Sequence, residues 1–238
     1  MPRNNKKIGK FIVIDGIDGS GKATQIKVLI KKLKEKGFKV ATIDFPQYSK
    51  KSAGLVEEYL NGKYGSSQDL GAYIPSVFYA CDRFDAGFKI KKWLDAGKIV
   101  VSDRYTSSNI GHQGGKIKNK RERKKFLKWL YCFEFDFLGI PKPDFSFILK
   151  IKPEISLMNT GNIKDKAKKA KKKSYLGNKK QDIHETDLSH LYQSLDSYLT
   201  VSKEFPEDFK VINCIKNNKM MSVEEIHQKI WKHIQKFL

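Results

Sequence analysis

A glycine-rich segment near the start of the chain has the residue types that bind phosphate groups. Residues 16–22 read Gly-Ile-Asp-Gly-Ser-Gly-Lys and fit the pattern G-x-x-x-x-G-K. Glycines let backbone N–H groups turn inward around phosphate oxygens, and the final lysine reaches the outer phosphates. The pattern predicts a nucleotide-binding loop. Its expected phosphate ligands are Gly16, Gly19, Ser20, Gly21, Lys22, Ala23 and Thr24.

The position after the lysine departs from this pattern, and the departure concerns Mg²⁺. A Ser or Thr there normally offers the ion a hydroxyl, whereas this chain has Ala23 and only then Thr24. Either Thr24 shifts into reach, or phosphates, waters and an acid elsewhere hold the ion. Asp103 is the best acid, because it ends an apolar run as a metal-site Asp ends its strand in phosphate-loop enzymes. We expect Asp103 to hold the ion through water.

A second group of residues has the types and spacing that can bind a flat ring and an anionic group. Tyr79 and Arg83 are four residues apart, so on a helix they share one face. There the ring can stack on a base while the guanidinium donates to a base carbonyl. Arg83 and Arg104 are informative because only five of the 47 Lys and Arg residues are Arg, which leaves 42 Lys. Arg offers a planar fork of donors that Lys cannot reproduce.

The elements that must position these residues alternate between strands and helices. Apolar, β-branched runs predict strands at residues 11–14, 40–43, 99–102, 145–149 and 211–212. Apolar residues at helical spacing predict helices at residues 22–37, 75–95 and 126–133. A capping box of Ser222 and Glu225 starts the last helix, whose apolar stripe is Val223, Ile226, Ile230, Ile234 and Phe237.

This alternation predicts an α/β, three-layer fold of the P-loop NTPase type. Its five-stranded parallel sheet is covered by helices on both faces, and residues 1–238 form a single domain. In such folds the active residues gather at the carboxyl ends of the strands. The phosphate loop, Asp103 and Arg104 all follow predicted strands, so we expect them to meet at one edge of the sheet.

Together with four further segments, the phosphate loop resembles the thymidylate kinase family. The segments are Phe45-Pro46-Gln47-Tyr48, Phe78 to Arg83, Asp103 to Asn109 with His112-Gln113, and Pro141-Lys142-Pro143-Asp144. Their order and spacing extend the resemblance from near the amino terminus to the last helix. The resemblance implies ATP-dependent phosphorylation of dTMP to dTDP, with Mg²⁺ as cofactor.

The resemblance also implies roles for single residues. It places thymine against Tyr79 and Arg83, the acceptor phosphate on Arg104, and the deoxyribose 3′-hydroxyl on Asp18. Phe78 is then expected in the core. The implied dTMP-binding residues are Asp18, Phe45, Pro46, Tyr48, Tyr79, Arg83, Arg104, Ser108, Asn109 and Gln113, and the implied catalytic residues are Lys22, Asp18, Arg104 and Asp103. His112 falls near a ring that excludes a 2′-hydroxyl, but an ordinary exposed histidine is the favoured interpretation.

A lysine-rich segment from Lys164 to Lys180 contains nine Lys and a single acid, Asp165. It is either a solvated loop or a lid over the phosphates, at about residues 160–182. Family members carry an extra Arg in the phosphate loop or in the lid. Here Gly19 occupies the loop position and the lid has no Arg, so the resemblance implies a lid lysine. The candidates are Lys168, Lys169, Lys171, Lys172 and Lys173. Beyond them, Glu185 resembles an acid that faces the acceptor.

Composition limits the other function classes. A net charge of +21 raises the question of nucleic acid, but the excess of Lys indicates a general compositional preference, so no specific nucleic-acid partner is expected. No apolar run approaches the ~18 residues of a membrane span, which favours a cytoplasmic protein without a membrane partner. Cys81, Cys132 and Cys214 lack metal-ligand spacing and are expected to be small buried hydrophobes.

Several alternatives stay open at this level. A deoxynucleoside kinase would use a free 5′-hydroxyl as acceptor and would need a carboxylate base beside it. A GTP-dependent switch usually carries Asn-Lys-x-Asp, and residues 119–122, Asn-Lys-Arg-Glu, fail at the last position. A basic nucleic-acid-binding protein is the remaining class. The resemblance further implies a homodimer, for which the predicted helices near residues 78–88 and 126–137 offer apolar side chains.

Overall fold

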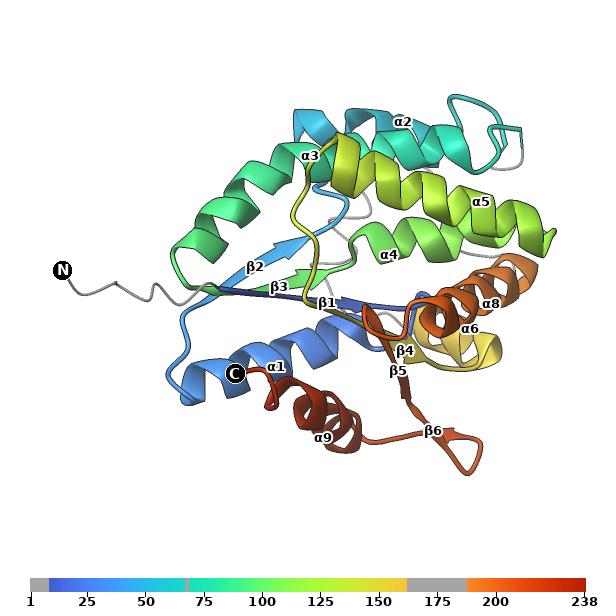
Figure 1. The fold of residues 1–238 in the computed structure, drawn as a ribbon. Helices are drawn as coiled ribbons and strands as arrows, with labels where there is room; N and C mark the ends of the chain where they lie inside the picture. Colours follow the sequence, from blue (N-terminus) through green and yellow to red (C-terminus); the bar gives the residue numbers. More distant parts are fainter. Residues whose placement is uncertain (1–8, 67–68, 162–187) are drawn as a thin grey trace.

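A parallel sheet of five strands lies at the centre of the structure (Figure 1). The computed structural model describes residues 9–66, 69–161 and 188–238. The strands follow the spatial order β2-β3-β1-β4-β5, and all neighbours are parallel. They are β1 (Lys10–Asp15), β2 (Val40–Asp44), β3 (Ile99–Asp103), β4 (Phe145–Lys150) and β5 (Phe209–Asn213). Each strand contains the apolar run that predicted it, so the predicted fold class is confirmed.

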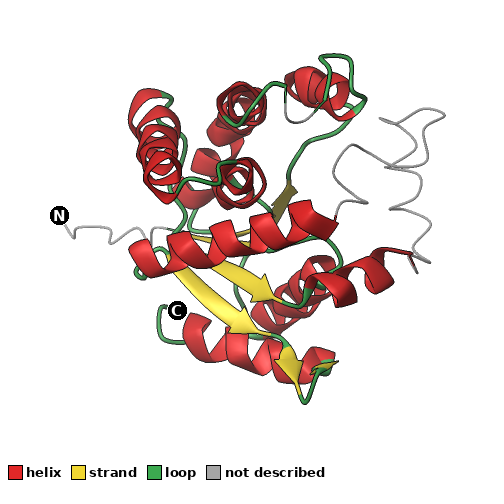
Figure 2. Cartoon of the chain, turned by 90° about the vertical axis from the view of Figure 1, so that its right-hand side faces the viewer, coloured by secondary structure: helices red, strands yellow, loops and turns green. Residues whose placement is uncertain are grey.

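Helices cover both faces of this sheet, as the two views in Figures 1 and 2 show. One face carries α1 (Lys22–Glu35) and α9 (Val223–Ile234), which pack against each other. The other face carries α3 (Tyr73–Asp95) and α5 (Lys120–Tyr131), with α2 (Gly54–Leu60) packed on α3. The two remaining long helices, α6 (Pro153–Gly161) and α8 (Leu188–Glu204), contact each other near the end of β4.

The register of β1 determines where the polar ends of the strands meet. β1 lies between β3 and β4, with Ile14 opposite Asp103. Residues 11–14 are buried, which explains the uninterrupted apolar run, because a central parallel strand is covered on both faces. Asp44 in turn lies opposite Asp103. The carboxyl ends of β1, β2 and β3 therefore open at one edge of the sheet, where the phosphate loop begins.

The predicted start of α9 is confirmed, while its apolar stripe is shorter than predicted. The Ser222 hydroxyl accepts from the Glu225 N–H at 3.2 Å, and the Ser222 N–H donates to the Glu225 carboxylate at 2.9 Å. The helix ends at Ile234, and Val223 and Phe237 are 46% and 42% exposed. Val223 is the first residue of the helix, whereas Phe237 follows its last residue and still packs its ring on Phe145 of β4, with centroids 4.0 Å apart.

Two of the cysteine predictions are wrong, and the error at Cys81 concerns the orientation of α3. Cys81 and Cys132 are exposed, and only Cys214 is buried. Phe84 and Phe88, at the same helical spacing as Cys81, are also exposed. Apolar spacing showed that α3 is a helix but did not indicate which side faces inward. The buried side carries mainly small residues and two charged ones: Pro75, Ser76, Ala80, Asp82, Arg83, Ala86, Gly87 and Ile90.

Short elements that the sequence did not predict surround the site. After β3 come α4 (Thr106–Ser108), η2 (Asn109–Gln113) and η3 (Gly114–Lys116), and after α5 comes the π-helical turn η4 (Cys132–Phe137). A small hairpin of β6 (Ile215–Lys216) and β7 (Lys219–Met220) precedes α9, and η1 (Lys51–Ala53) precedes α2. Within the described ranges, no helix combines the length and hydropathy that a membrane span requires.

Candidate active site

The phosphate loop joins β1 to α1 through glycines in left-handed backbone conformations. Gly16, Gly19 and Gly21 have φ angles of 139°, 71° and 90°. Residues with a Cβ rarely adopt such angles, so these turns require glycine. Lys22 is the first residue of α1, and its ammonium donates to the carbonyl oxygens of Gly16 and Ile17 at 3.0 Å each. The loop therefore has the strand, turn and helix context that the sequence predicts.

Lys22 lies among charges of both signs. Its Nζ is 3.7 Å from the Asp18 carboxylate. Burial lowers the pKa of Lys22, and the neighbouring Arg104 cation lowers it further, while the carboxylates of Asp18 and Asp103 raise it. A phosphate between the two cations would stabilise the charged form of Lys22. The loop and Arg104 therefore form one anion-binding region.

Arg104 is held rigidly at the end of β3. Its φ of 66° is a left-handed conformation, which is uncommon for a residue with a side chain and is found preferentially at functional sites. Its N–H donates to the carbonyl of Ile14 at 3.1 Å, and the Ser102 hydroxyl donates to its carbonyl at 2.6 Å. The guanidinium forms a short ion pair with Asp18. Burial opposes the charge, but the carboxylates of Asp18 and Asp15 hold the pKa of Arg104 well above its usual value.

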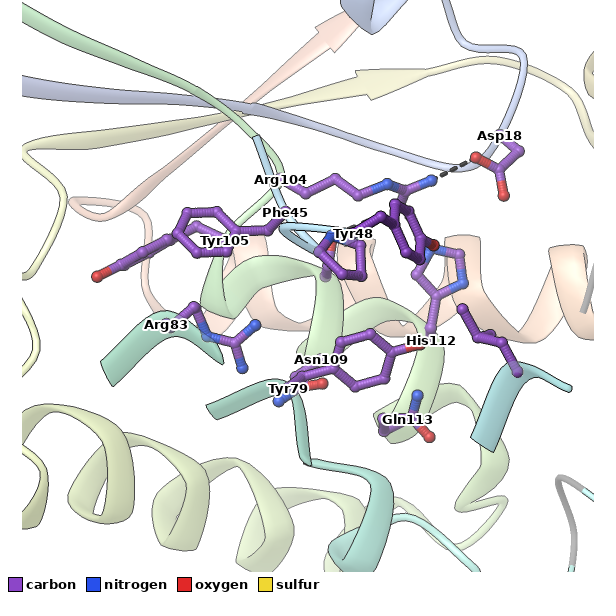
Figure 3. A pocket seen from close by; sticks show the side chains of 13 residues that line it. Asp18, Phe45, Tyr48, Tyr79, Arg83, Arg104, Tyr105, Asn109, His112 and Gln113 are labelled. Atoms are coloured by element: carbon purple, nitrogen blue, oxygen red, sulfur yellow. Dashed lines mark hydrogen bonds and ion pairs between the residues drawn. The ribbon is translucent and has the colours of Figure 1, made fainter. Parts of the chain in front are cut away.

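A pocket opens beside this ion pair and collects the residues that were expected to bind dTMP (Figure 3). Every member of that predicted set lines it, although the set comes from separate parts of the chain. Their contact with a ligand stays a prediction. Leu60 and Tyr105 also line the pocket and were not predicted. The full lining is Asp18, Phe45, Pro46, Tyr48, Leu60, Tyr79, Arg83, Arg104, Tyr105, Ser108, Asn109, His112 and Gln113.

The two ends of the pocket differ in chemistry. Figure 3 shows the Arg104 guanidinium turned toward Asp18, whereas Arg83, Asn109 and Tyr79 lie farther from that ion pair. Arg104 offers a cation, while the other end offers an aromatic ring and hydrogen-bonding groups. Such a pocket suits a molecule with an anionic group at one end and a flat polar ring at the other.

Arg83 is buried and bonded to a carboxylate that the sequence did not reveal. Its Nε and NH2 atoms each lie 2.6 Å from an oxygen of Glu134, whose side chain is fully buried in η4. Asn109 also donates to Glu134, at 3.3 Å, and to the carbonyl of Ser76 at 3.1 Å. The guanidinium keeps NH1 and the second hydrogen of NH2 clear of this fork. Glu134 lies in an aromatic stretch, Cys-Phe-Glu-Phe-Asp-Phe, where acids among aromatic residues are the available signal but do not distinguish Glu134 from Asp136.

The aromatic wall of the pocket belongs to a small cluster of its own. Tyr79 packs edge to face on the buried Tyr59, with ring centroids 6.4 Å apart. Phe78, which was expected in the core, is half-buried in the same cluster and contacts the rings of Tyr59 and Tyr64. The Tyr59 hydroxyl accepts from Lys116 at 2.8 Å. Tyr79 is thus supported by other rings rather than by the main sheet.

His112 contradicts the interpretation favoured from sequence. It is half-buried in the pocket, not exposed, and its Nε2 lies 3.0 Å from the NH1 of Arg104. Because a guanidinium only donates, Nε2 accepts and the proton lies on Nδ1, which faces Nε2 of His190 at 3.3 Å. The ring therefore orients Arg104. The residue that completes this pair, His190, comes from α8, far away in the sequence.

Asp15 is the second buried carboxylate that was missed. It ends β1, is fully buried, and accepts from the hydroxyls of Ser107 at 2.6 Å and Tyr198 at 2.8 Å. Ser108, expected to line the base and sugar, lines the pocket but donates its hydroxyl to Asp15 at 2.8 Å. Arg104 NH1 is 3.9 Å from Asp15. The carboxylate therefore fixes the segment after β3 against the start of the phosphate loop.

Two predicted ligand residues have polar atoms without a protein partner in the described part of the chain. The Ser20 hydroxyl and the Gln113 amide oxygen are both buried and accept or donate no hydrogen bond there. Burying such groups costs roughly 1–3 kcal/mol each. Ser20 lies in the phosphate loop and Gln113 lines the pocket, so each belongs to a part of the site where a ligand is expected.

The sequence profile described as thymidylate kinase matches residues 14–230, from the end of β1 into α9. The chain belongs to the thymidylate kinase family. A thymidylate kinase of Mycobacterium tuberculosis is 32% identical over 149 residues, which cover 61% of this chain and 68% of that protein. One of Caldicellulosiruptor saccharolyticus is 30% identical over 231 residues, 97% of this chain and 98% of that protein.

Two further relatives extend the comparison. A probable thymidylate kinase of Methanosarcina barkeri is 29% identical over 97% of this chain and 98% of its own length. Among solved structures, the thymidylate kinase of Candida albicans superposes with a TM-score of 0.68 at 22% identity, covering 96% of this chain and 92% of that one. This likeness confirms the fold, and the family profile confirms the resemblance drawn from the motifs.

Gly19 occupies the loop position where the family resemblance implied an Arg in other members. In this thymidylate kinase homologue there is no space for a side chain at that position. A Cβ added to Gly19 would lie 2.6 Å from the backbone oxygen of Ser156 in α6. The Ser156 hydroxyl donates to the Asp18 carbonyl, and the Asn159 amide donates to the Gly19 carbonyl at 2.9 Å. Neither residue of α6 was predicted. Their contacts show that α6 supports the phosphate loop from the side where an arginine would project.

Residues suited to Mg²⁺ lie at the loop, but they do not form a closed ligand cage. The ion prefers oxygen ligands and retains several waters. Asp103 lies close enough to Lys22 to raise the pKa of that amine. Ser20, in the same loop as Lys22, has a buried hydroxyl without a hydrogen-bond partner among the described residues. Ala23 offers no ligand and Thr24 is exposed on α1. In the described ranges, no three His, Cys, Asp or Glu side chains converge as a metal site. The donor set fits an ion held largely by phosphates and water.

The remaining predicted residues fall outside the part of the chain that the structure describes. These are the lid candidates Lys168, Lys169, Lys171, Lys172 and Lys173, and the acid Glu185.

Proposed function

We propose that this chain transfers the terminal phosphoryl group of ATP to dTMP and releases dTDP and ADP. Membership of the thymidylate kinase family supports this reaction. The observation that carries the proposal is the position of Arg104, between the phosphate loop and a pocket with a polar aromatic end. In that arrangement the donor and acceptor phosphates converge on the same two cations, Lys22 and Arg104.

The acceptor enters with thymine at the Tyr79 end and its phosphate at Arg104. Tyr79 stacks on the ring, and Arg83 NH1 donates to a ring carbonyl. The monophosphate takes the place of Asp18 on the Arg104 guanidinium. Asp18 then turns to the 3′-hydroxyl of the sugar. The ion pair between Asp18 and Arg104 therefore has to open when the nucleotide binds.

The donor binds to the loop amides and Lys22, with its terminal phosphate directed at the acceptor. Phosphoryl transfer asks for alignment and positive charge rather than covalent help from the protein. Asp103 and Ser20 would help to hold Mg²⁺, which would supply positive charge to the donor phosphates when bound. Lid lysines among residues 168–173 add further charge in place of the arginine that other members carry. No general base is required, because the acceptor phosphate is already ionised near neutral pH.

The chain forms a homodimer in this proposal, in a cytoplasmic setting and as one domain. Support comes from exposed aromatic side chains on neighbouring elements: Phe84 and Phe88 of α3 are 41% and 69% exposed, and Phe137 of η4 is 78% exposed. Light scattering on purified protein checks this. We expect twice the chain mass, and the variant Phe88→Glu should shift the mass to that of one chain. A wild-type protein with the mass of one chain would contradict the dimer.

The reaction is tested by ADP release with a panel of acceptors at saturating ATP. We expect turnover with dTMP, weaker turnover with dUMP, and none above background with dCMP, dGMP or thymidine. Thymidine separates this enzyme from a deoxynucleoside kinase, because it lacks the phosphate that Arg104 is proposed to bind. Turnover of thymidine without turnover of dTMP would reject the proposal.

A further inference from the structure

Glu134 connects the residues at the base end of the pocket without itself lining it. One carboxylate oxygen accepts from Arg83 Nε at 2.6 Å and from the Thr106 hydroxyl at 2.8 Å. The other accepts from Arg83 NH2 at 2.6 Å and from the Asn109 amide at 3.3 Å. Its side chain is fully buried, and its carbonyl accepts from the N–H of Ile140 at 3.1 Å. It is therefore a fixed charge that three side chains share.

These bonds determine which atoms of Asn109 a ligand can meet. The amide nitrogen has two hydrogens, and they are directed to Glu134 and to the carbonyl of Ser76. The amide cannot rotate by half a turn without placing its oxygen against the carboxylate and that carbonyl. Its oxygen is therefore the atom offered to the pocket, and it can only accept a hydrogen bond.

The same carboxylate determines what Arg83 offers. Glu134 takes the Nε hydrogen and one hydrogen of NH2, so NH1 and the second hydrogen of NH2 remain as donors for the pocket. A guanidinium nitrogen only donates. The charge is maintained because Glu134 outweighs the cost of burial and raises the pKa of Arg83 above its usual value. The base end therefore presents a donor from Arg83 next to an acceptor from Asn109.

We propose that Glu134 is a positioning residue that makes this pocket select pyrimidines with a ring carbonyl beside a ring N–H. Thymine and uracil present that pair at O4 and N3. Cytosine presents the reverse, an amino group and an unprotonated nitrogen, so both bonds would be mismatched. Selection by buried polar groups is strong, because a wrong ligand leaves them unpaired. This inference rests on the proposed function, in which Arg83 and Asn109 face the base.

The test compares Glu134→Gln with wild type by calorimetric binding of dTMP and dCMP and by steady-state kinetics. In this variant the new amide N–H group faces the donors of Arg83 or Asn109. The Asn109 amide is then no longer held in one orientation. We expect the dTMP Kd and KM to rise about tenfold or more, and the preference for dTMP over dCMP to fall by at least about tenfold. The KM for ATP should stay within about twofold.

Two further variants keep the test decisive. Glu134→Asp retains the negative charge beside Arg83 and so provides a second test if Glu134→Gln does not fold, but it is one methylene shorter and cannot reach all three donors. It should also lose preference for dTMP. The matched control is Asp196→Asn, which breaks the 2.6 Å ion pair of the buried Arg123 away from the pocket and should leave the preference unchanged.

The outcomes separate this inference from the proposed function. If wild type binds and phosphorylates dTMP selectively, and folded Glu134→Asp and Glu134→Gln keep that preference, Glu134 does not set the selection. An equal loss of dTMP and ATP affinity would assign it a structural role only, and would also overturn the inference. Failure of the wild type to bind or turn over dTMP would instead reject the proposed function.

Discussion

The donor loop and the acceptor pocket are both expected to bind a nucleotide, but the loop uses mainly backbone groups and the pocket uses side chains. The loop is one continuous segment whose glycines and backbone groups form the site, so seven consecutive residues, 16–22, contain nearly all of it. The pocket draws its lining from α2, α3, α4, η2, the segments that follow β2 and β3, and the loop itself. Its polar side chains are held by two buried carboxylates, Asp15 and Glu134, that do not line it. A backbone site can be recognised from local sequence, whereas a side-chain site depends on distant supports.

The largest effect is expected at the donor loop. Lys22→Ala removes the cation that would meet the transferring phosphates, and we expect kcat to fall by roughly 10²–10³ while the KM for dTMP changes little. The exposed Lys27 of the same helix provides the matched control, and Lys27→Ala should retain wild-type turnover. Steady-state kinetics measure both. A rise in the dTMP KM equal to the fall in kcat would show that the two sites are not separable in this way.

Arg104→Gln tests the acceptor side of the comparison. Losing a charge-assisted bond to the monophosphate should raise the dTMP KM by about tenfold to a hundredfold, at roughly 1.5–3 kcal/mol, with the ATP KM nearly unchanged. Arg121→Gln, at an exposed arginine of α5, is the control and should behave as wild type. An unchanged dTMP KM in Arg104→Gln would remove the acceptor phosphate from this residue.

A smaller effect is expected when a glycine of the phosphate loop, rather than a glycine of an ordinary turn, is replaced by alanine. Gly19→Ala and Gly37→Ala both place an alanine at positive φ, 71° and 83°, at a cost of about 1–2 kcal/mol. At Gly37 nothing lies within 4 Å of the added carbon, but at Gly19 it would meet Ser156 at 2.6 Å. We expect Gly19→Ala to be the less stable variant in urea unfolding and to lose ATP affinity. Equal stability of the two would show that α6 does not confine the loop.

The smallest effect concerns the support of Tyr79. Burial lowers the pKa of Lys116, which donates to Tyr59, to about 7 from 10.5. Between these values the unfolded chain binds more protons, so this group makes stability rise with pH across that window. In Lys116→Met the free energy of unfolding should rise less steeply from pH 7 to 9 than in wild type. Parallel curves would mean that Lys116 is charged in the folded protein at pH 9.

The features that could be predicted from the sequence also differ between the loop and the pocket. The strands and the phosphate loop were predictable because burial on two faces and tight turns restrict residue types locally. The acceptor residues were found through motif spacing and the family resemblance, not through local physics. Glu134 and Asp15 were missed because a buried acid gains its meaning only from donors distant in the chain, such as Arg83 and Tyr198. His112 was misjudged for the same reason, since its partner His190 lies on α8.

The central claim is that donor and acceptor phosphates meet between Lys22 and Arg104. A crystal structure with dTMP and a non-hydrolysable ATP analogue tests it most directly. We predict the thymine ring between Tyr79 and Arg83, the monophosphate on Arg104 in place of Asp18, and the analogue's phosphates within the loop at Lys22. A dTMP molecule bound outside this pocket, or an intact ion pair between Asp18 and Arg104 in the complex, would contradict it.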